Sequence, residues 1–182
     1  MRALLIIDYT NDFVATDGAL TTGSAGQALE HPIIDLANSF LDHGDAVILP
    51  TDLHQANDPY HPETALYPPH NLAKTRGREL YGRLADWYAT HQNDSHVHFM
   101  DKNRYSAFAN TGLDSYLRQR QITDLHLAGV CTDICVLHTA VDAYDLDYDL
   151  TVHRTAVASF DPTGHAWALN HFEHAMGATI VD

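Results

Sequence analysis

Short apolar runs alternate with stretches of helical periodicity along the whole chain of 182 residues. The apolar runs predict strands near 3–8, 46–51, 95–100, 124–129, 149–153 and 178–181. The stretches between them predict helices near 28–43, 76–91, 111–121, 133–145 and 163–176. Such alternation indicates a three-layer α/β/α fold with a six-stranded, mainly parallel, Rossmann-like sheet. The length suits a single domain over residues 1–182.

Residues 55–75 interrupt this alternation. They contain prolines and histidines and show neither helical nor strand periodicity. Loops of this length inside a compact domain are usually functional. We therefore expect this segment to contribute to a binding or catalytic site.

Cys135 stands in the first turn of a predicted helix, directly after the buried strand that ends near Val130. The positive end of a helix dipole favours a thiolate, and the free N–H groups of a first turn can hold an oxyanion. An inert buried cysteine is the alternative interpretation. This segment alone does not decide between the two.

Asp8 and Lys102 occupy equivalent positions after two other predicted strands. Ligands of open parallel sheets bind beyond the carboxyl ends of the strands, so adjacent strands would bring Asp8, Lys102 and Cys135 together. Taken singly, the aspartate could be a turn former and the lysine a solvated surface residue. Together they supply the base, the cation and the thiol of an activated nucleophile.

With these motifs the chain resembles the isochorismatase-like cysteine hydrolases and, among them, the nicotinamidases. The resemblance rests on Asp8, Asn11-Asp-Phe13, Gly18-Ala-Leu20, Thr51-Asp-Leu-His54, Asp101-Lys102 and Gly129-Val-Cys-Thr-Asp-Ile-Cys-Val136. It implies that Asp8, Lys102 and Cys135 form a catalytic triad. It also implies a cis peptide bond between Val130 and Cys131, and an oxyanion hole made by the backbone amides of Cys131 and Cys135.

A candidate metal site follows another strand. Asp52 and His54 are two residues apart and point to the same side of an extended segment; His70 follows in the long loop. One carboxylate and two imidazoles suit zinc, iron or manganese, although 14 histidines make chance pairs common in this chain. The resemblance implies one divalent ion, zinc before iron or manganese, with Glu63 as a further, water-bridged ligand.

Three aromatic residues lie within a few positions of these motifs: Phe13, Tyr67 and Tyr105. Each alone is most simply explained by ordinary packing. The resemblance implies that they line the pocket that holds a pyridine ring.

The resulting hypothesis is hydrolysis of nicotinamide to nicotinate and ammonia through a cysteine thioester, with the metal binding the pyridine nitrogen, in NAD salvage. One alternative is a metal-independent amidase of the same superfamily that acts on a carbamoyl or ureido substrate. A second is a metallohydrolase whose nucleophile is metal-bound hydroxide, which would make Cys135 dispensable. A non-catalytic binding module is disfavoured because both residue sets are complete.

Composition excludes several other classes. The chain has 24 acidic and 10 basic residues, a formal charge of −14 and no basic cluster, which disfavours nucleic acid and anionic membranes as partners. No apolar run approaches the roughly 20 residues of a membrane span. The chain starts on a strand, so we expect no signal peptide; with only two cysteines, a reducing cytoplasm is the expected location. A homo-oligomer is expected from the resemblance.

Overall fold

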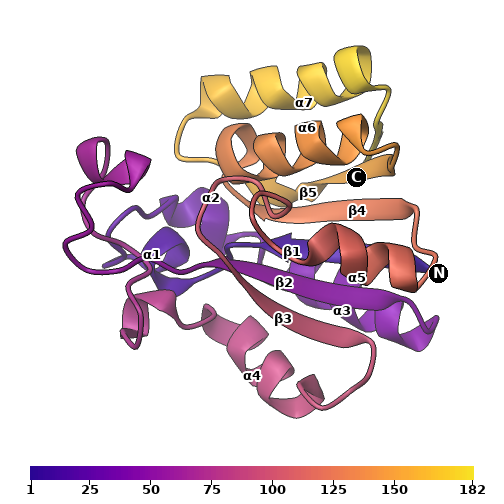
Figure 1. Cartoon of the computed structure of the whole chain (residues 1–182), viewed down its shortest axis with the longest axis horizontal. Coiled ribbons are helices and arrows are strands. Elements are labelled where there is room, and N and C mark those ends of the chain that lie inside the picture. The colour runs from indigo at the N-terminus through magenta and orange to yellow at the C-terminus, as the bar shows by residue number, and fades with distance from the viewer.

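Six parallel strands form the sheet, in the order β3-β2-β1-β4-β5-β6 (Figure 1). The structure is a computed structural model that describes residues 1–182. The strands are β1 Arg2–Ile7, β2 Ala46–Asp52, β3 Val97–Lys102, β4 Asp124–Val130, β5 Asp149–Ala158 and β6 Thr179–Val181. The predicted α/β class and parallel sheet are confirmed.

Helices cover both faces of the sheet. They are α1 Asn11–Val14, α2 Gly23–Gln27, α3 Glu30–Asp42, α4 Gly82–His91, α5 Leu113–Gln119, α6 Leu137–Asp145 and α7 Pro162–Met176. Two 3-10 turns, η1 Pro62–Ala65 and η2 Arg76–Arg78, and one π-helical turn, η3 Thr132–Val136, complete the elements. Figure 1 shows α6 and α7 stacked beside β4 and β5, and α4 at the opposite end of the sheet, beyond β3.

The side chains of β1 divide between two buried cores because successive residues of a strand point to opposite faces. Ala3, Leu5 and Ile7 join the core that packs against α5, α6 and α7. Leu4 and Ile6 join the core that packs against α3 and α4. Burial on both faces explains why the strands read as continuous apolar runs.

The predicted helix over 76–91 is wrong in its first half. Only η2 and α4 are helical, and the residues between them are extended. The backbone there pairs with the segment after β1: Asn11 N–H donates to Glu79 O (2.9 Å), and Tyr81 N–H donates to Tyr9 O (3.0 Å). These long-range bonds replace the helical ones, and Gly82, with φ of 52°, starts α4 afresh. Helices α1 and α2 were not predicted because four and five residues are too short to show a period.

β5 extends five residues beyond its predicted end, past an irregularity in its pairing with β4. At the same place β4 passes very close to β1. A Cβ atom on Gly129 would lie 2.0 Å from Ile7 O, and φ of this glycine is 108°. The close approach therefore requires glycine here.

The order of the strands reverses between β1 and β4, which are neighbours in the sheet although β2 and β3 lie between them in the sequence. In open α/β sheets, ligands bind at such a switch point, beyond the carboxyl ends of the strands. Asp8 directly follows β1, and Cys131 directly follows β4. None of the helices is both long and apolar enough to cross a bilayer.

Candidate active site

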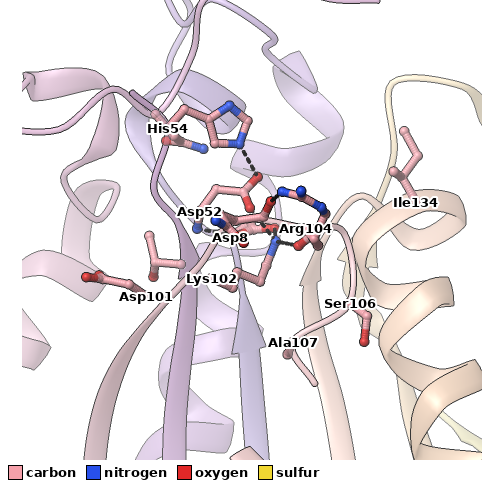
Figure 2. Close-up of polar contacts among 12 residues, drawn as sticks. Asp8, Asp52, His54, Asp101, Lys102, Arg104, Ser106, Ala107 and Ile134 are labelled. Carbon is pink, nitrogen blue, oxygen red and sulfur yellow. Dashed lines mark hydrogen bonds and ion pairs between the residues drawn. The ribbon is translucent and has the colours of Figure 1, made fainter. Parts of the chain in front are cut away.

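Lys102, the last residue of β3, lies between two buried carboxylates (Figure 2). Its Nζ is 2.7 Å from Asp8 Oδ2 and 2.6 Å from Asp52 Oδ1, and it also donates to Arg104 O (3.1 Å). The lysine side chain is fully buried. Burial alone would lower its pKa, but the charges of Asp52 and Asp8 outweigh burial and raise the pKa well above its usual value. The ammonium is therefore a permanent cation.

Asp8 is held rigidly at the end of β1. It is fully buried and has a positive φ of 55°; its Oδ1 accepts a hydrogen bond from Asp52 N–H (2.8 Å). Burial and the carboxylate of Asp52 raise its pKa to about 7, against the opposing effect of Lys102. Oδ2 lies beside the ammonium yet accepts no well-directed hydrogen bond. One oxygen of a carboxyl group that can gain or lose a proton near neutral pH thus remains available.

Cys135 lies beside the carboxyl group of Asp8. One atom each of the Cys135 thiol and the Asp8 and Asp52 carboxylates all lie within 4.8 Å of one another. The sequence predicts that the helix start favours the thiolate, and the structure adds an opposing effect, the burial of the thiol. Burial raises the pKa of the thiol well above its usual value, and the nearby cation of Lys102 only partly opposes this. A thiol with a raised pKa becomes a nucleophile only after a base removes its proton, and the carboxyl group of Asp8 lies within reach.

The turn that carries Cys135 is a π-helical turn rather than the first turn of an ordinary α-helix. Cys131 O accepts from both Ile134 N–H and Val136 N–H, each at 3.1 Å. Thr132 Oγ1 shares a hydrogen bond with His165 Nδ1 of α7 (2.8 Å), which ties the turn to that helix. The Val130–Cys131 peptide bond is cis, as predicted. Single π-helical turns occur frequently at functional sites.

A second cluster contains the four residues predicted to bind metal: Asp52, His54, Glu63 and His70. All four are buried, and one ligand atom of each lies within 4.8 Å of the others. His54 Nε2 is 3.8 Å from Asp52 Oδ2 and 3.9 Å from Glu63 Oε1, and His70 Nε2 is 3.3 Å from Glu63 Oε2. Buried atoms without a hydrogen-bond partner are rare, yet Asp52 Oδ2, His54 Nε2 and His70 Nε2 all lack one. A divalent cation would satisfy all three.

His70 is oriented for such a role by its own backbone. Its Nδ1–H donates to Pro68 O (2.9 Å), so in the neutral ring Nε2 carries the lone pair and faces the cluster. The segment that carries it pairs with the end of β2: His54 N–H donates to Asn71 O (3.0 Å). Asn71 is itself fully buried, and its backbone N–H donates to Asp12 Oδ2 (2.7 Å). The loop over 55–75 is therefore anchored at its metal-binding end.

A narrow apolar cavity of about 20 Å³ opens beside the thiol. Its lining includes the aromatic residues that were predicted to form a pocket, together with others from the site: Phe13, Leu20, Glu63, Tyr67, Tyr105, Cys131, Ile134, Cys135 and Phe160. A second cavity of about 120 Å³ adjoins it through Glu63 and Tyr67 and reaches His54 and His70. The predicted triad, metal set and pocket residues thus lie in one continuous region.

Three lining residues, Leu20, Ile134 and Phe160, were not predicted as site residues. Leu20 and Ile134 lie within the motifs of the resemblance, but nothing in their spacing marks them as part of a cavity wall. Phe160 follows β5, whose predicted end fell seven residues earlier. The correct end of β5 would have placed Phe160 at the same edge of the sheet as Asp8 and Cys131.

A thiol, a carboxyl group and an ammonium gathered at the switch point of a parallel sheet are suited to nucleophilic catalysis. The chain belongs to the isochorismatase family, because the model of the isochorismatase domain matches residues 2–182.

Individual relatives agree with this assignment. The chain is 55% identical to the uncharacterized isochorismatase family protein PncA of Bacillus subtilis, over 100% of this chain and 99% of that protein. It is 32% identical to the nicotinamidase of Escherichia coli, over 98% of this chain and 93% of that enzyme. The crystal structure of nicotinamidase/pyrazinamidase PncA from Bacillus subtilis matches with a TM-score of 0.98 and 53% identity, covering 100% of both chains.

Proposed function

We propose that this protein is an amidohydrolase that converts nicotinamide to nicotinate and ammonia. The observation that carries the proposal is the fully buried Lys102 between Asp8 and Asp52, beside a buried thiol and a buried set of metal-binding atoms. The names of the similar nicotinamidases support the choice of substrate. We propose Asp8, Lys102 and Cys135 as the catalytic residues.

In the first half of the reaction, Asp8 removes the proton of the Cys135 thiol. Sulfur attacks the carboxamide carbon, and the carbonyl electron pair moves onto oxygen. The backbone N–H groups of Cys131 and Cys135 stabilise this oxyanion, and the Lys102 ammonium stabilises the negative charge that builds up beside it. The intermediate collapses with cleavage of the C–N bond, and Asp8 returns its proton to the departing amine, which leaves as ammonia.

In the second half, water hydrolyses the thioester. Asp8 takes a proton from water while the oxygen attacks the thioester carbon; the C–S bond then breaks, and the thiolate regains a proton. Nicotinate is released. A pKa near 7 suits a group that must alternate between base and acid.

Asp52, His54 and His70, with Glu63 directly or through water, would hold one divalent metal ion, and zinc fits this donor set best. When bound, the ion supplies a Lewis acid that accepts the lone pair of the pyridine nitrogen. Phe13, Tyr67 and Tyr105 would enclose the ring.

The cellular role that follows is recovery of the pyridine ring for NAD synthesis. We place this reaction in one domain that spans the chain. A thiol nucleophile must stay reduced, which suits the cytoplasm. Assembly into a homo-oligomer stays a prediction.

The decisive experiment measures ammonia release from nicotinamide, pyrazinamide and benzamide, with metal analysis of the same sample. Benzamide has the shape of nicotinamide but lacks the ring nitrogen. Losing a contact around which a site is built costs on the order of a thousandfold in kcat/KM, so benzamide should be turned over poorly.

His54→Ala should lower metal content and nicotinamide turnover together, whereas the matched change at the exposed His174 should alter neither. Equal rates on benzamide and nicotinamide, or full activity without metal, would contradict the proposal. Preferential release of ammonia from a carbamoyl or ureido compound would instead favour the metal-independent amidase.

A further inference from the structure

Arg78 is the one charged side chain outside the proposed site that binds the backbone of a proposed metal ligand. Its Nε–H donates to Asp52 O (2.8 Å), and its Nη2 lies 3.5 Å from Thr51 O. The same Nη2 forms an ion pair with Asp101. The guanidinium also lies over the ring of Phe99, 5.5 Å from its centroid. One side chain thus contacts the last residues of β2 and the end of β3.

These contacts fall on the final rungs of the β2–β3 pair. Thr51 is opposite Asp101 in this pair, and Asp52 is opposite Lys102. β3 is an edge strand, so no further strand supports its outer side. Figure 2 shows the Asp101 side chain pointing away from the ammonium of Lys102. The ion pair between Arg78 and Asp101 holds the end of β3, and the next residue of this strand is Lys102.

The backbone next to Arg78 is bound to the segment that follows β1 and Asp8. It ends the η2 turn, and the residues after it pair with the segment that follows Asp8: Asn11 N–H donates to Glu79 O, and Tyr81 N–H to Tyr9 O. The arginine therefore starts from a segment bound beyond β1 and reaches the ends of β2 and β3. These three ends carry Asp8, Asp52 and Lys102.

The two carboxylate oxygens of Asp52 face different groups, so a shift of this side chain affects both. Its Oδ1 is 2.6 Å from Lys102 Nζ, whereas its Oδ2 faces the metal-binding cluster without a hydrogen-bond partner. A small rotation of this residue would alter both contacts together. The hydrogen bond from Arg78 to Asp52 O fixes the peptide group on the C-terminal side of Asp52.

We propose that Arg78 is a positioning residue: it ties the ends of β2 and β3 to the segment after β1 and so sets the geometry of Asp52 between Lys102 and the metal ligands. This inference rests on the proposed function. Arginine suits the role because its planar, forked guanidinium can bind a carbonyl and a carboxylate at once, which the single ammonium of lysine does not reproduce.

A neighbouring cavity allows a direct test of that role. A void of about 330 Å³ is lined by Arg78 together with Lys74, Tyr88 and Phe99, and the Arg78 side chain is 17% exposed. When the side chain is removed, guanidinium added to the solution can reach the position that it occupied.

The test compares Arg78→Ala, Arg78→Lys and Arg76→Ala with the unmodified protein. Arg76 is the matched control, because its side chain is 67% exposed and pairs only with the exposed Asp17. Zinc affinity is measured by competition with a chromophoric chelator, which needs no turnover. kcat and KM for nicotinamide are measured with and without guanidinium at low millimolar concentration, with sodium chloride as the salt control.

We expect Arg78→Ala to weaken zinc binding by on the order of 10-fold to 100-fold, as outer-shell partners of metal ligands do, and to lower kcat more than it raises KM. Guanidinium should restore part of both losses in Arg78→Ala and have no effect on Arg76→Ala. Arg78→Lys should recover less than added guanidinium does.

Unchanged zinc affinity and kcat in a folded Arg78→Ala protein would overturn the inference. So would losses that guanidinium does not reverse. If Arg78→Ala does not fold, the zinc affinity of Arg78→Lys decides, and a value equal to that of the unmodified protein counts against the role. Failure of the unmodified protein to hydrolyse nicotinamide would instead refute the proposed function and leave the zinc measurements interpretable.

Discussion

Replacing Lys102 with methionine should test whether the buried ammonium holds the two carboxylates together. The change removes the ammonium and leaves a neutral, unbranched side chain that is one atom shorter. It leaves Asp8 and Asp52 buried, with no cation between them and with Oδ1 of Asp8 still bound to Asp52 N–H. Removing one partner of a buried ion pair typically costs about 3–5 kcal/mol of unfolding free energy.

The cost should depend on pH in a defined direction. In the folded protein the pKa of Asp8 is about 7, above its ordinary value, so folding is favoured when Asp8 is protonated, and this contribution falls as pH rises from about 4 towards about 7. Without Lys102, the principal group that opposes this shift is gone, so the pKa of Asp8 rises further. The destabilisation should therefore be larger near pH 8 than near pH 5.

The assay is urea unfolding monitored by circular dichroism. A chelator is present so that no bound metal replaces the missing cation. In a thermal melt of the same variant, a loss of about 3–5 kcal/mol corresponds for a chain of this length to a fall in Tm of roughly 6–20 °C. The double variant, Asp8→Asn combined with Lys102→Met, also removes one of the two buried carboxylates. It should therefore recover much of the unfolding free energy that Lys102→Met loses. A loss below about 1 kcal/mol at high pH, or no recovery in the double variant, would refute the electrostatic reasoning.

Three further predictions follow from other parts of the structure. Cys135→Ala should abolish ammonia release while the fold is kept, whereas Cys131→Ala should keep turnover because its proposed contribution is a backbone N–H; intact-mass analysis after iodoacetamide should locate the label on Cys135. Gly129→Ala should lower Tm by at least several degrees, because its Cβ would lie 2.0 Å from Ile7 O, whereas Gly112→Ala, with nothing within 4 Å of the new atom, should leave Tm nearly unchanged. Burial, followed by the nearby His126 and Arg2, lowers the pKa of His153 to about 4, so the contribution of His153 to the free energy of unfolding should fall as pH decreases from about 6.5 to about 4; in urea titrations at several pH values, His153→Gln should therefore gain stability relative to His174→Gln as pH decreases over this range.

The strands and the location of the site could be predicted from the sequence because both depend on local patterns. Strands buried on both faces are apolar throughout, and chemistry in parallel sheets collects beyond their carboxyl ends. Asp8 and Lys102 could therefore be placed near Cys135 without knowledge of the strand order. The resemblance added Glu63, which no spacing rule connects to His54.

What could not be predicted depends on contacts between distant segments. The break before α4 arises from pairing of Glu79 and Tyr81 with the chain after β1, which no window over 76–91 contains. The raised pKa of Cys135 arises from its burial, which outweighs the cation of Lys102. The contact of Arg78 with Asp52 O joins residues 26 positions apart through a side chain that carries no recognisable motif.

Asp52 makes the proposed catalytic group and the proposed metal site parts of one structure. One of its oxygens binds the ammonium of Lys102, and the other faces His54 among the metal-binding atoms. A cation in that cluster would partly neutralise the carboxylate of Asp52. The repulsion by which Asp52 raises the pKa of Asp8 would then be weaker. A metal ion held by these residues would therefore have two consequences: it would orient the ring of the proposed substrate, and it would tune the pKa of Asp8, the proposed acid–base group on the other side of Asp52.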